Sequence, residues 1–235
     1  RLEINMRKGV KEMAVINIRG DIVSNDDKWI YDWFEMDATC PKDVKDILEA
    51  AQEDEEIEVL VNSGGGSVMA GQEIYSALMG SDKVTIKIQS LAGSAAGVVA
   101  MAGRCLISPV AMIMIHNVSM SGASGDYHDM QKNAEILKQM NAAMANAYSE
   151  KSGRPLDEIL KLMDRETWLT ANQCLEYGFV DEIMTEQQEA QYTNSFSGMW
   201  LTDEKRQQAI KEKAEADETE KMKNEILEDL DMYGV

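Results

Sequence analysis

Cysteine is scarce in this sequence, and its positions argue against a disulfide framework or a zinc site. The chain of 235 residues has only three, Cys40, Cys105 and Cys174, at wide spacings and without a Cys-x-x-Cys pair. Disulfide scaffolds and structural zinc sites need more cysteines at closer spacing. We therefore expect three buried or half-buried thiols in a reducing cytoplasm, with no cofactor and no metal.

Basic residues are also scarce. Lys and Arg number 23 against 42 Asp and Glu, which gives a formal net charge of −19 at pH 7. Surfaces that bind nucleic acid or anionic membranes need clustered Lys and Arg. We therefore expect neither nucleic acid nor membrane as a partner, and we expect protein partners instead.

Long apolar runs are missing as well. The most apolar stretch, residues 91–115, is interrupted by Arg104 and Pro109, whereas a membrane-spanning helix needs about 20 continuous apolar residues. The first ten residues, RLEINMRKGV, contain no apolar core of a signal peptide. We expect a cytoplasmic protein.

Patterns typical of strands alternate with patterns typical of helices along the chain. The expected strands are residues 13–19, 57–61, 84–88, 105–107, 111–115 and 179–184. The expected helices are residues 26–34, 94–103 and 126–150, with others that begin near Pro41, Ser67, Pro155 and Thr170. This alternation predicts βαβ units and an α/β fold with a largely parallel sheet.

The patterning weakens after Met184. Residues 185–198 are polar without a clear period, and residues 201–233 are rich in Glu, Lys, Gln and Ala with few large apolar side chains. We therefore predict one domain over residues 1–184. A polar linker and an acidic charged tail, helical or disordered, follow over residues 185–235.

Two histidines are candidates for a general base, and their settings differ. His116 ends the apolar strand MIMIH, at the carboxyl edge of the predicted sheet, where the sites of open α/β sheets gather. His128 begins a polar helical segment, and we expect it in water. A lone histidine is more often structural than functional, so His116 becomes a candidate base only if a suitable nucleophile lies near it.

Ser94 is the candidate nucleophile. It follows a strand, opens a predicted helix and has only Ala and Gly as near neighbours, so a substrate backbone could approach its hydroxyl. Taken alone, it would be an ordinary N-cap serine. The run Gly64-Gly65-Gly66 lies between a strand and a helix, without the Lys of a P-loop. It would serve either as an oxyanion hole or as a flexible turn.

Four segments together resemble the ClpP family of self-compartmentalised serine peptidases. They are VNSGGGSVMAGQEIYSAL (61–78), SLAGSAAG (90–97), MIMIHNV (112–118) and ETWLTANQCLEYGFVDEI (166–183), in the family's order and at about its spacing. The resemblance covers roughly residues 14–184. It implies a ClpP/crotonase-like superhelix of βαβ units with a long handle helix.

The resemblance also implies roles for individual residues. Ser94 matches the family's nucleophile, and His116 matches its general base. Gly66 and Ala95 match the two residues whose backbone N–H groups form the oxyanion hole. The family's third triad residue, an Asp, falls on Glu166.

The chain departs from the family at several positions. Gly64 replaces the proline of the family's Asn-Ser-Pro-Gly-Gly turn, and Ala96 replaces the glycine two residues after the nucleophile. The acid at Glu166 is Glu rather than Asp, and Asp164 is the alternative carboxylate. These departures and the tail resemble the divergent branch encoded by tailed phages and prophages, whose peptidases act in head maturation. The resemblance further implies a strand at about residues 122–126 that would pair with bound peptide.

The expected function is that of a serine endopeptidase with a Ser-His-acid mechanism. Its expected partners are protein or peptide substrates, further copies of the chain in a homo-oligomeric ring, and an AAA+ ATPase or a capsid scaffold. Its location would be the host cytoplasm, or the prohead if the chain is phage-encoded. Two alternatives stay open: a crotonase-type acyl-CoA enzyme, which has no need of the serine–histidine pair, and a non-catalytic capsid-assembly scaffold on the same fold.

Overall fold

The structure is a computed structural model, which describes residues 13–185 and 203–233. The described strands are β1 (Met13–Ile22), β2 (Ala38–Thr39), β3 (Glu56–Gly66), β4 (Val84–Gly93), β5 (Arg104–Ile107), β6 (Met112–Ile115), β7 (Thr167–Thr170) and β8 (Glu182–Ile183). The described helices are α1 (Lys28–Trp33), α2 (Pro41–Ala50), α3 (Val68–Leu78), α4 (Ala95–Ala100), α5 (Tyr127–Ser152), α6 (Leu156–Asp164), α7 (Ala171–Tyr177) and α8 (Asp203–Tyr233).

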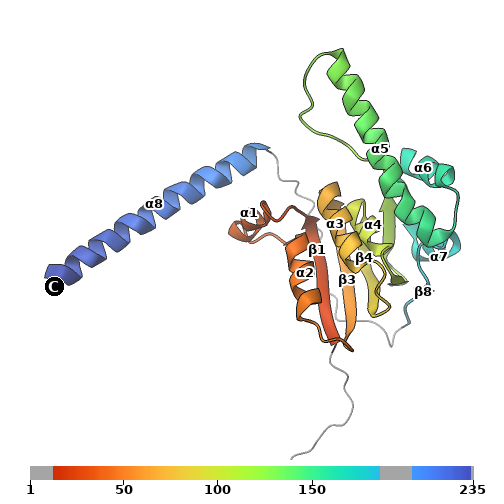
Figure 1. The fold of residues 1–235 in the computed structure, drawn as a ribbon, viewed down its shortest axis with the longest axis horizontal. Coiled ribbons are helices and arrows are strands. Elements are labelled where there is room, and N and C mark those ends of the chain that lie inside the picture. Colours follow the sequence, from red (N-terminus) through yellow and green to blue (C-terminus); the bar gives the residue numbers. More distant parts are fainter. Residues whose placement is uncertain (1–12, 186–202, 234–235) are drawn as a thin grey trace, which may run out of the picture.

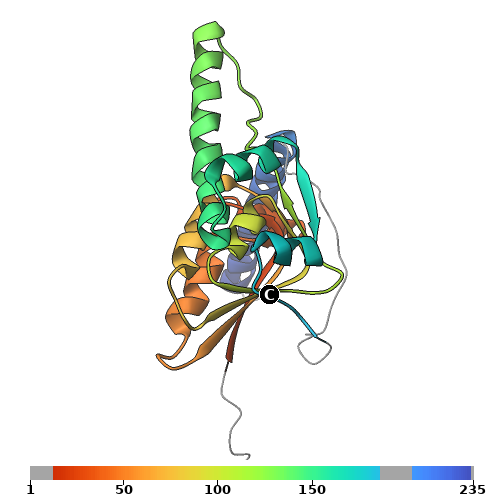
Figure 2. The same cartoon turned by 90° about the vertical axis from the view of Figure 1, so that its right-hand side faces the viewer.

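One sheet contains all of these strands. Its main path runs in the order β2-β1-β3-β4-β5-β8, and every pair along it is parallel. β6 pairs in parallel with the C-terminal residues of β4, and β7 lies antiparallel to β6. The helices α2 and α3 lie side by side along the sheet (Figures 1 and 2). The predicted α/β fold with a parallel sheet and a long helix is confirmed.

Three strands continue beyond the points where the sequence predicted that they end. β1 passes through Gly20, β3 runs through the glycine run to Gly66, and β4 continues to Gly93. The pairing shifts register after Arg19 in β1 and after Val61 in β3. Glycine has a weak strand propensity, but neighbouring strands supply backbone partners that the local sequence does not reveal. The ends of these three strands therefore lie next to one another.

Two other expectations are wrong. The helix expected over residues 94–103 is limited to the six residues of α4. Residues 122–126, expected as a strand, are irregular and exposed. This segment, GASGD, contains none of the β-branched or aromatic residues that favour strands, so it has little tendency to form a strand by itself.

The core is built from alternate residues of the central strands and from the helices that pack on them. Burial of one large apolar side chain contributes roughly 1.5–3 kcal/mol to the free energy of folding. The fully buried strand residues include Ile16, Ile18, Val59, Val61, Ile86 and Ile88. The sheet is therefore a rigid base for the residues that follow its strands.

Helix α5 has 26 residues, and only its second half packs on the domain. Its buried side chains are Met144, Ala145, Ala147 and Tyr148, and Tyr148 packs against Phe179 with ring centroids 5.3 Å apart. The first half projects away from the sheet (Figures 1 and 2). This arrangement agrees with the expected long handle helix.

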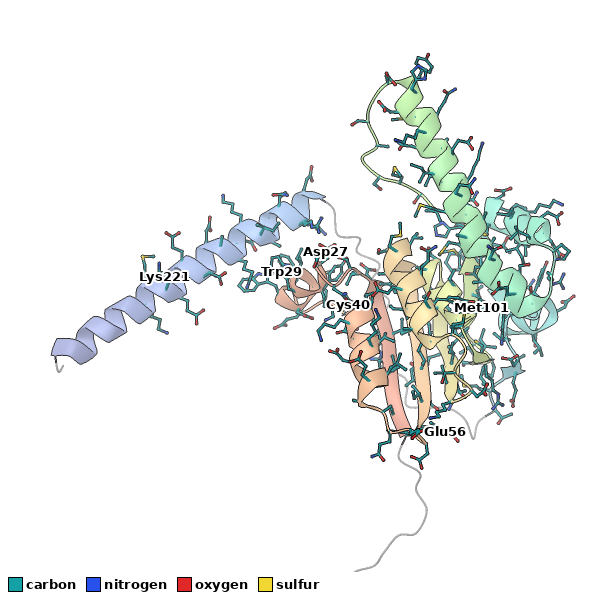
Figure 3. The ribbon with its side chains drawn as sticks, viewed as in Figure 1. Asp27, Trp29, Cys40, Glu56, Met101 and Lys221 are labelled. Atoms are coloured by element: carbon teal, nitrogen blue, oxygen red, sulfur yellow. The ribbon has the colours of Figure 1, made fainter. Side chains whose placement is uncertain are left out.

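The first turns of helix α8 pack on the domain, against α1. Arg206 forms an ion pair with Asp27, and Nζ of Lys213 lies 5.5 Å from the ring centroid of Trp29 and 5.4 Å from that of Trp33. Ala209 is fully buried in this contact region. Figure 3 labels Asp27 and Trp29 where α1 meets α8, and the rest of α8 extends beyond them. Of the linker expected over residues 185–198, residues 186–198 lie outside the described residues.

Candidate active site

Ser94 lies in the turn between β4 and α4, and its backbone is strained. Its φ is +51° and its ψ is −121°, a combination that costs a residue with a side chain roughly 1–3 kcal/mol. Its N–H donates to the carbonyl of Met114 at 2.8 Å, which holds the turn against β6. A serine on a sharp strand-to-helix turn presents its hydroxyl at the end of the sheet, as the nucleophile does in α/β-hydrolases. The strain is therefore of the kind found at functional sites.

His116 directly follows β6, and its ring faces Ser94. Because Met114 of β6 is paired with Gly93 of β4, the residues that follow these two strands lie close together. Nε2 of His116 is 2.7 Å from Oγ of Ser94. This is hydrogen-bond distance between a nucleophile and a base. The structure thus brings together the two residues that the sequence singled out, 22 positions apart.

The glycine run lies directly beside Ser94. A Cβ on Gly65 would be 2.7 Å from Cβ of Ser94 and 2.9 Å from the nitrogen of Ala95. A Cβ on Gly66 would be 2.2 Å from the carbonyl oxygen of Ile22. Their φ angles of +101° and +148° also favour glycine. The close approach of this backbone to Ser94 therefore requires glycine, and Gly65 is the contact that the sequence alone did not single out.

Strand pairing brings Glu166 towards the end of β6. In the antiparallel pair of β6 and β7, Ile115 is opposite Thr167, so the next residues outward are His116 and Glu166. Glu166 has a φ of +48°, in the left-handed region that residues with a side chain rarely adopt. This backbone conformation interrupts the extended geometry just where the two residues would meet.

The carboxylates of Glu166 and Asp164 both have partners other than the histidine. Oε1 of Glu166 accepts from Nε1 of Trp168 at 3.3 Å, and Oδ1 of Asp164 accepts from Nδ2 of Asn117 at 2.9 Å. In the described part of the chain, no carboxylate is hydrogen-bonded to Nδ1 of His116. The structure therefore brings Ser94 and His116 into contact. The carboxylates of Glu166 and Asp164 are hydrogen-bonded to Trp168 and Asn117 instead of to the imidazole.

The second histidine is in a different environment. His128 is exposed at the start of α5, where its ring packs against that of Tyr127 in a tilted arrangement with centroids 3.8 Å apart. Its backbone N–H donates to the side chain of Asp126, which caps the helix. The expectation that His128 lies in water is confirmed.

The three cysteines are buried and free. Burial raises the pKa of Cys174 to about 12 and also raises the pKa of Cys105 and Cys40. A raised pKa keeps a thiol protonated, and the thiolate is the reactive form. Among residues 13–185 and 203–233, no group of three or more His, Cys, Asp or Glu side chains could hold a metal ion, and no helix is long and apolar enough to cross a membrane.

Known proteins share this arrangement of segments. The family model described as Clp protease matches residues 44–187. The chain is 33% identical over 145 residues to ATP-dependent Clp protease proteolytic subunit 2 of Tropheryma whipplei (strain Twist), which covers 60% of this chain and 79% of that protein. It is 33% identical over 142 residues to the proteolytic subunit of Porphyromonas gingivalis (58% and 63% covered) and to proteolytic subunit 1 of Chlamydia muridarum (58% and 74% covered). The chain therefore belongs to the Clp protease family, as a ClpP-like serine peptidase.

Proposed function

We propose that this chain is a serine endopeptidase in which Ser94 is the nucleophile and His116 is the general base. The observation that carries the proposal is the 2.7 Å contact between Nε2 of His116 and Oγ of Ser94, made on a strained turn. A serine hydroxyl is a weak nucleophile until an adjacent base accepts its proton.

The proposed reaction has two stages. Oγ of Ser94 attacks the peptide carbonyl while Nε2 of His116 takes the hydroxyl proton, and the imidazolium then gives this proton to the leaving amine. In the second stage, His116 deprotonates a water molecule that hydrolyses the acyl-enzyme and releases Ser94. Backbone N–H groups of Gly66 and Ala95 would bind the oxyanion in both stages, and one such donor is worth about 10²–10³ in turnover.

Glu166 is the proposed acid of the triad. Its support is the strand register, which continues from Ile115 and Thr167 to His116 and Glu166. The carboxylate would have to leave Trp168 and turn to Nδ1 of the imidazole. Such contacts are often long in the absence of substrate and tighten when it binds.

The working form that we propose is a homo-oligomeric ring that encloses the active sites. The relatives named above are proteolytic subunits of ATP-dependent proteases, and an AAA+ ATPase is accordingly the proposed partner. The exposed first half of α5 offers a surface for contact between copies of the chain. None of the relatives named above is a phage protein, so a role in phage head maturation stays an expectation that rests on Gly64, Ala96 and the tail.

A serine-directed fluorophosphonate probe tests the proposed chemistry. We expect one labelled residue, Ser94, identified by mass spectrometry of the digested adduct. His116→Ala should slow labelling at least about 100-fold because the hydroxyl loses its base, whereas the matched change His128→Ala should leave the rate unchanged. A crotonase-type enzyme or a non-catalytic scaffold has no activated serine, and absence of labelling in the wild type would favour one of these.

Removal of the tail should leave small-peptide cleavage nearly intact. Every residue of the proposed site lies before Met184, and the described contacts of Arg206 and Lys213 in α8 are with Asp27, Trp29 and Trp33. The ion pair of Arg206 with Asp27 and the cation–π contacts of Lys213 with Trp29 and Trp33 each contribute about 1 kcal/mol or less to stability. A chain ending at Leu201 should therefore keep kcat/KM within about twofold of the full chain.

The control is the thermal unfolding of both proteins. A modest fall in midpoint is expected, because α8 covers Ala209 and part of two tryptophans. Insolubility of the shortened chain, or collapse of its peptidase activity, would show that the tail belongs to the folded domain and that the proposed boundary at residue 184 is wrong.

A further inference from the structure

The hydroxyl of Ser63 joins two backbone segments beneath the glycine run. Ser63 is 3% exposed. Its Oγ donates to the carbonyl of Gly20 at 2.6 Å, and it accepts from the N–H of Gly65 at 3.1 Å. One side chain therefore links the glycine run to β1, 43 positions earlier in the sequence.

This link lies where the sheet pairing is irregular on both sides. The register between β1 and β3 shifts between Arg19 and Asp21, and the register between β3 and β4 shifts between Val61 and Ser63. The ladder between β1 and β3 is therefore interrupted at Ser63, and it resumes with Asp21 opposite Gly65 and Ile22 opposite Gly66. The hydroxyl supplies a donor and an acceptor where the ladder is broken.

Within the glycine run, the ladder to β1 resumes at Gly65 and Gly66, whereas Gly64 falls in the gap of that ladder. Glycine has more backbone freedom than any other residue type, and this segment has three in succession. Gly64 also has open space beside it, because an added Cβ would meet no atom within 4 Å. The hydrogen bond to Ser63 is thus a further restraint on the glycine run, placed where the ladder to β1 is interrupted.

The position of Gly65 bears directly on the nucleophile. Its α-carbon faces Ser94 so closely that an added Cβ would lie 2.7 Å from Cβ of Ser94. Its N–H is already committed to Ser63, so Gly65 is not free to act as an oxyanion donor. The next N–H along the chain, that of Gly66, is the one that the proposed mechanism uses.

We propose that Ser63 is a positioning residue for the oxyanion hole: its hydroxyl holds Gly65, and through it Gly66, at the distance from Ser94 that the transition state requires. This proposal rests on the proposed function. A misplaced oxyanion donor weakens the transition state more than the bound substrate. Loss of the hydroxyl should therefore lower kcat and leave KM nearly unchanged.

The test compares Ser63→Ala with Thr39→Val in the full chain, using cleavage of a model peptide. Thr39 is also 3% exposed, and its Oγ1 donates to the carbonyl of Arg19 at 3.0 Å, so its loss removes a buried hydroxyl bond without touching the glycine run. We expect Ser63→Ala to lower kcat about 10- to 100-fold with KM within about twofold. Thr39→Val should lower the unfolding temperature and leave kcat unchanged.

A second change tests whether the effect acts through the loop. Gly64 lacks the positive φ that would exclude proline, and proline reduces backbone freedom. Adding Gly64→Pro to Ser63→Ala should restore at least about a third of the lost kcat. If Ser63→Ala does not fold, Ser63→Cys, which has a similar shape and a weaker hydrogen-bonding group, should show the same fall in kcat to a smaller degree.

The outcomes separate this proposal from the proposed function. If the wild type labels at Ser94 with the fluorophosphonate probe but Ser63→Ala, or Ser63→Cys in its place, keeps kcat, then Ser63 is only structural. The same conclusion follows if kcat falls equally in Thr39→Val. If the wild type does not label at all, the proposed function has failed, and with it the premise of this inference.

Discussion

Replacing Ser94 with alanine should leave a folded protein whose peptide hydrolysis is at least about 10⁴-fold slower, because the change removes the covalent route. The backbone should not move, because the N–H of Ser94 that bonds to Met114 is kept. The measurement is single-turnover cleavage of a model peptide, with circular dichroism to confirm the fold.

Ser94→Gly is the matched variant for this experiment. Glycine adopts a positive φ at no steric cost, so it should relieve the strain at φ +51° and raise the unfolding temperature, while cleavage is lost as in Ser94→Ala. A more stable but inactive Ser94→Gly protein would show that the strained turn lowers stability and is kept because the reaction needs the serine there. Retained turnover in Ser94→Ala, with contaminating protease excluded, would instead rule out Ser94 as the nucleophile.

The acid of the triad should be revealed by comparing Glu166→Gln with Asp164→Asn. The carboxylate holds the imidazole in the correct tautomer and stabilises its charged form, and loss of that charge costs about 10⁴ in turnover in a well-studied serine protease. We expect Glu166→Gln to slow acylation of Ser94 by about 10³-fold or more. Asp164→Asn should change it by no more than about threefold.

Both substitutions leave an amide oxygen that can accept the hydrogen bond the carboxylate now accepts. A glutamine at 166 can still accept from Trp168, and an asparagine at 164 can still accept from Asn117. Differences in acylation therefore report on charge near the histidine rather than on folding. The rate of fluorophosphonate labelling is the measurement, with thermal unfolding as the control.

The reverse result would correct the register. If Asp164→Asn is the damaging change and Glu166→Gln is nearly neutral, Asp164 is the acid and must leave Asn117 when substrate binds. If neither change matters, His116 acts with Ser94 as a dyad, or it takes its orientation from a backbone carbonyl.

Much of the fold follows from local patterns. The alternation of strands and helices predicted the parallel sheet, and Ser94 and His116 were recognisable because each follows a strand of that sheet. Parallel strands place the residues after their carboxyl ends at one edge, and the resemblance of the surrounding segments to one family then joined the two residues as a pair. The helix expected to begin near Thr170 was likewise found as α7, because the hydrogen bond from the N–H of Thr170 to Gln173 that marks its start spans only three residues.

The long-range details could be obtained only from the tertiary structure. β2 and β7 are short, and their hydrogen bonds go to strands distant in the sequence. The same holds for the continuation of β3 through its glycines and for the bond from Ser63 to Gly20.

The sequence by itself therefore determined the α/β fold and the family, and it pointed to Ser94 and His116 as the candidate pair, since each of these depends on local periodicity or on residue identity within short segments. Only the tertiary structure decided how the glycine run is held beside Ser94 and where the carboxylates of Glu166 and Asp164 point. Those features depend on hydrogen bonds and close contacts between segments far apart in the chain, and no local pattern encodes them.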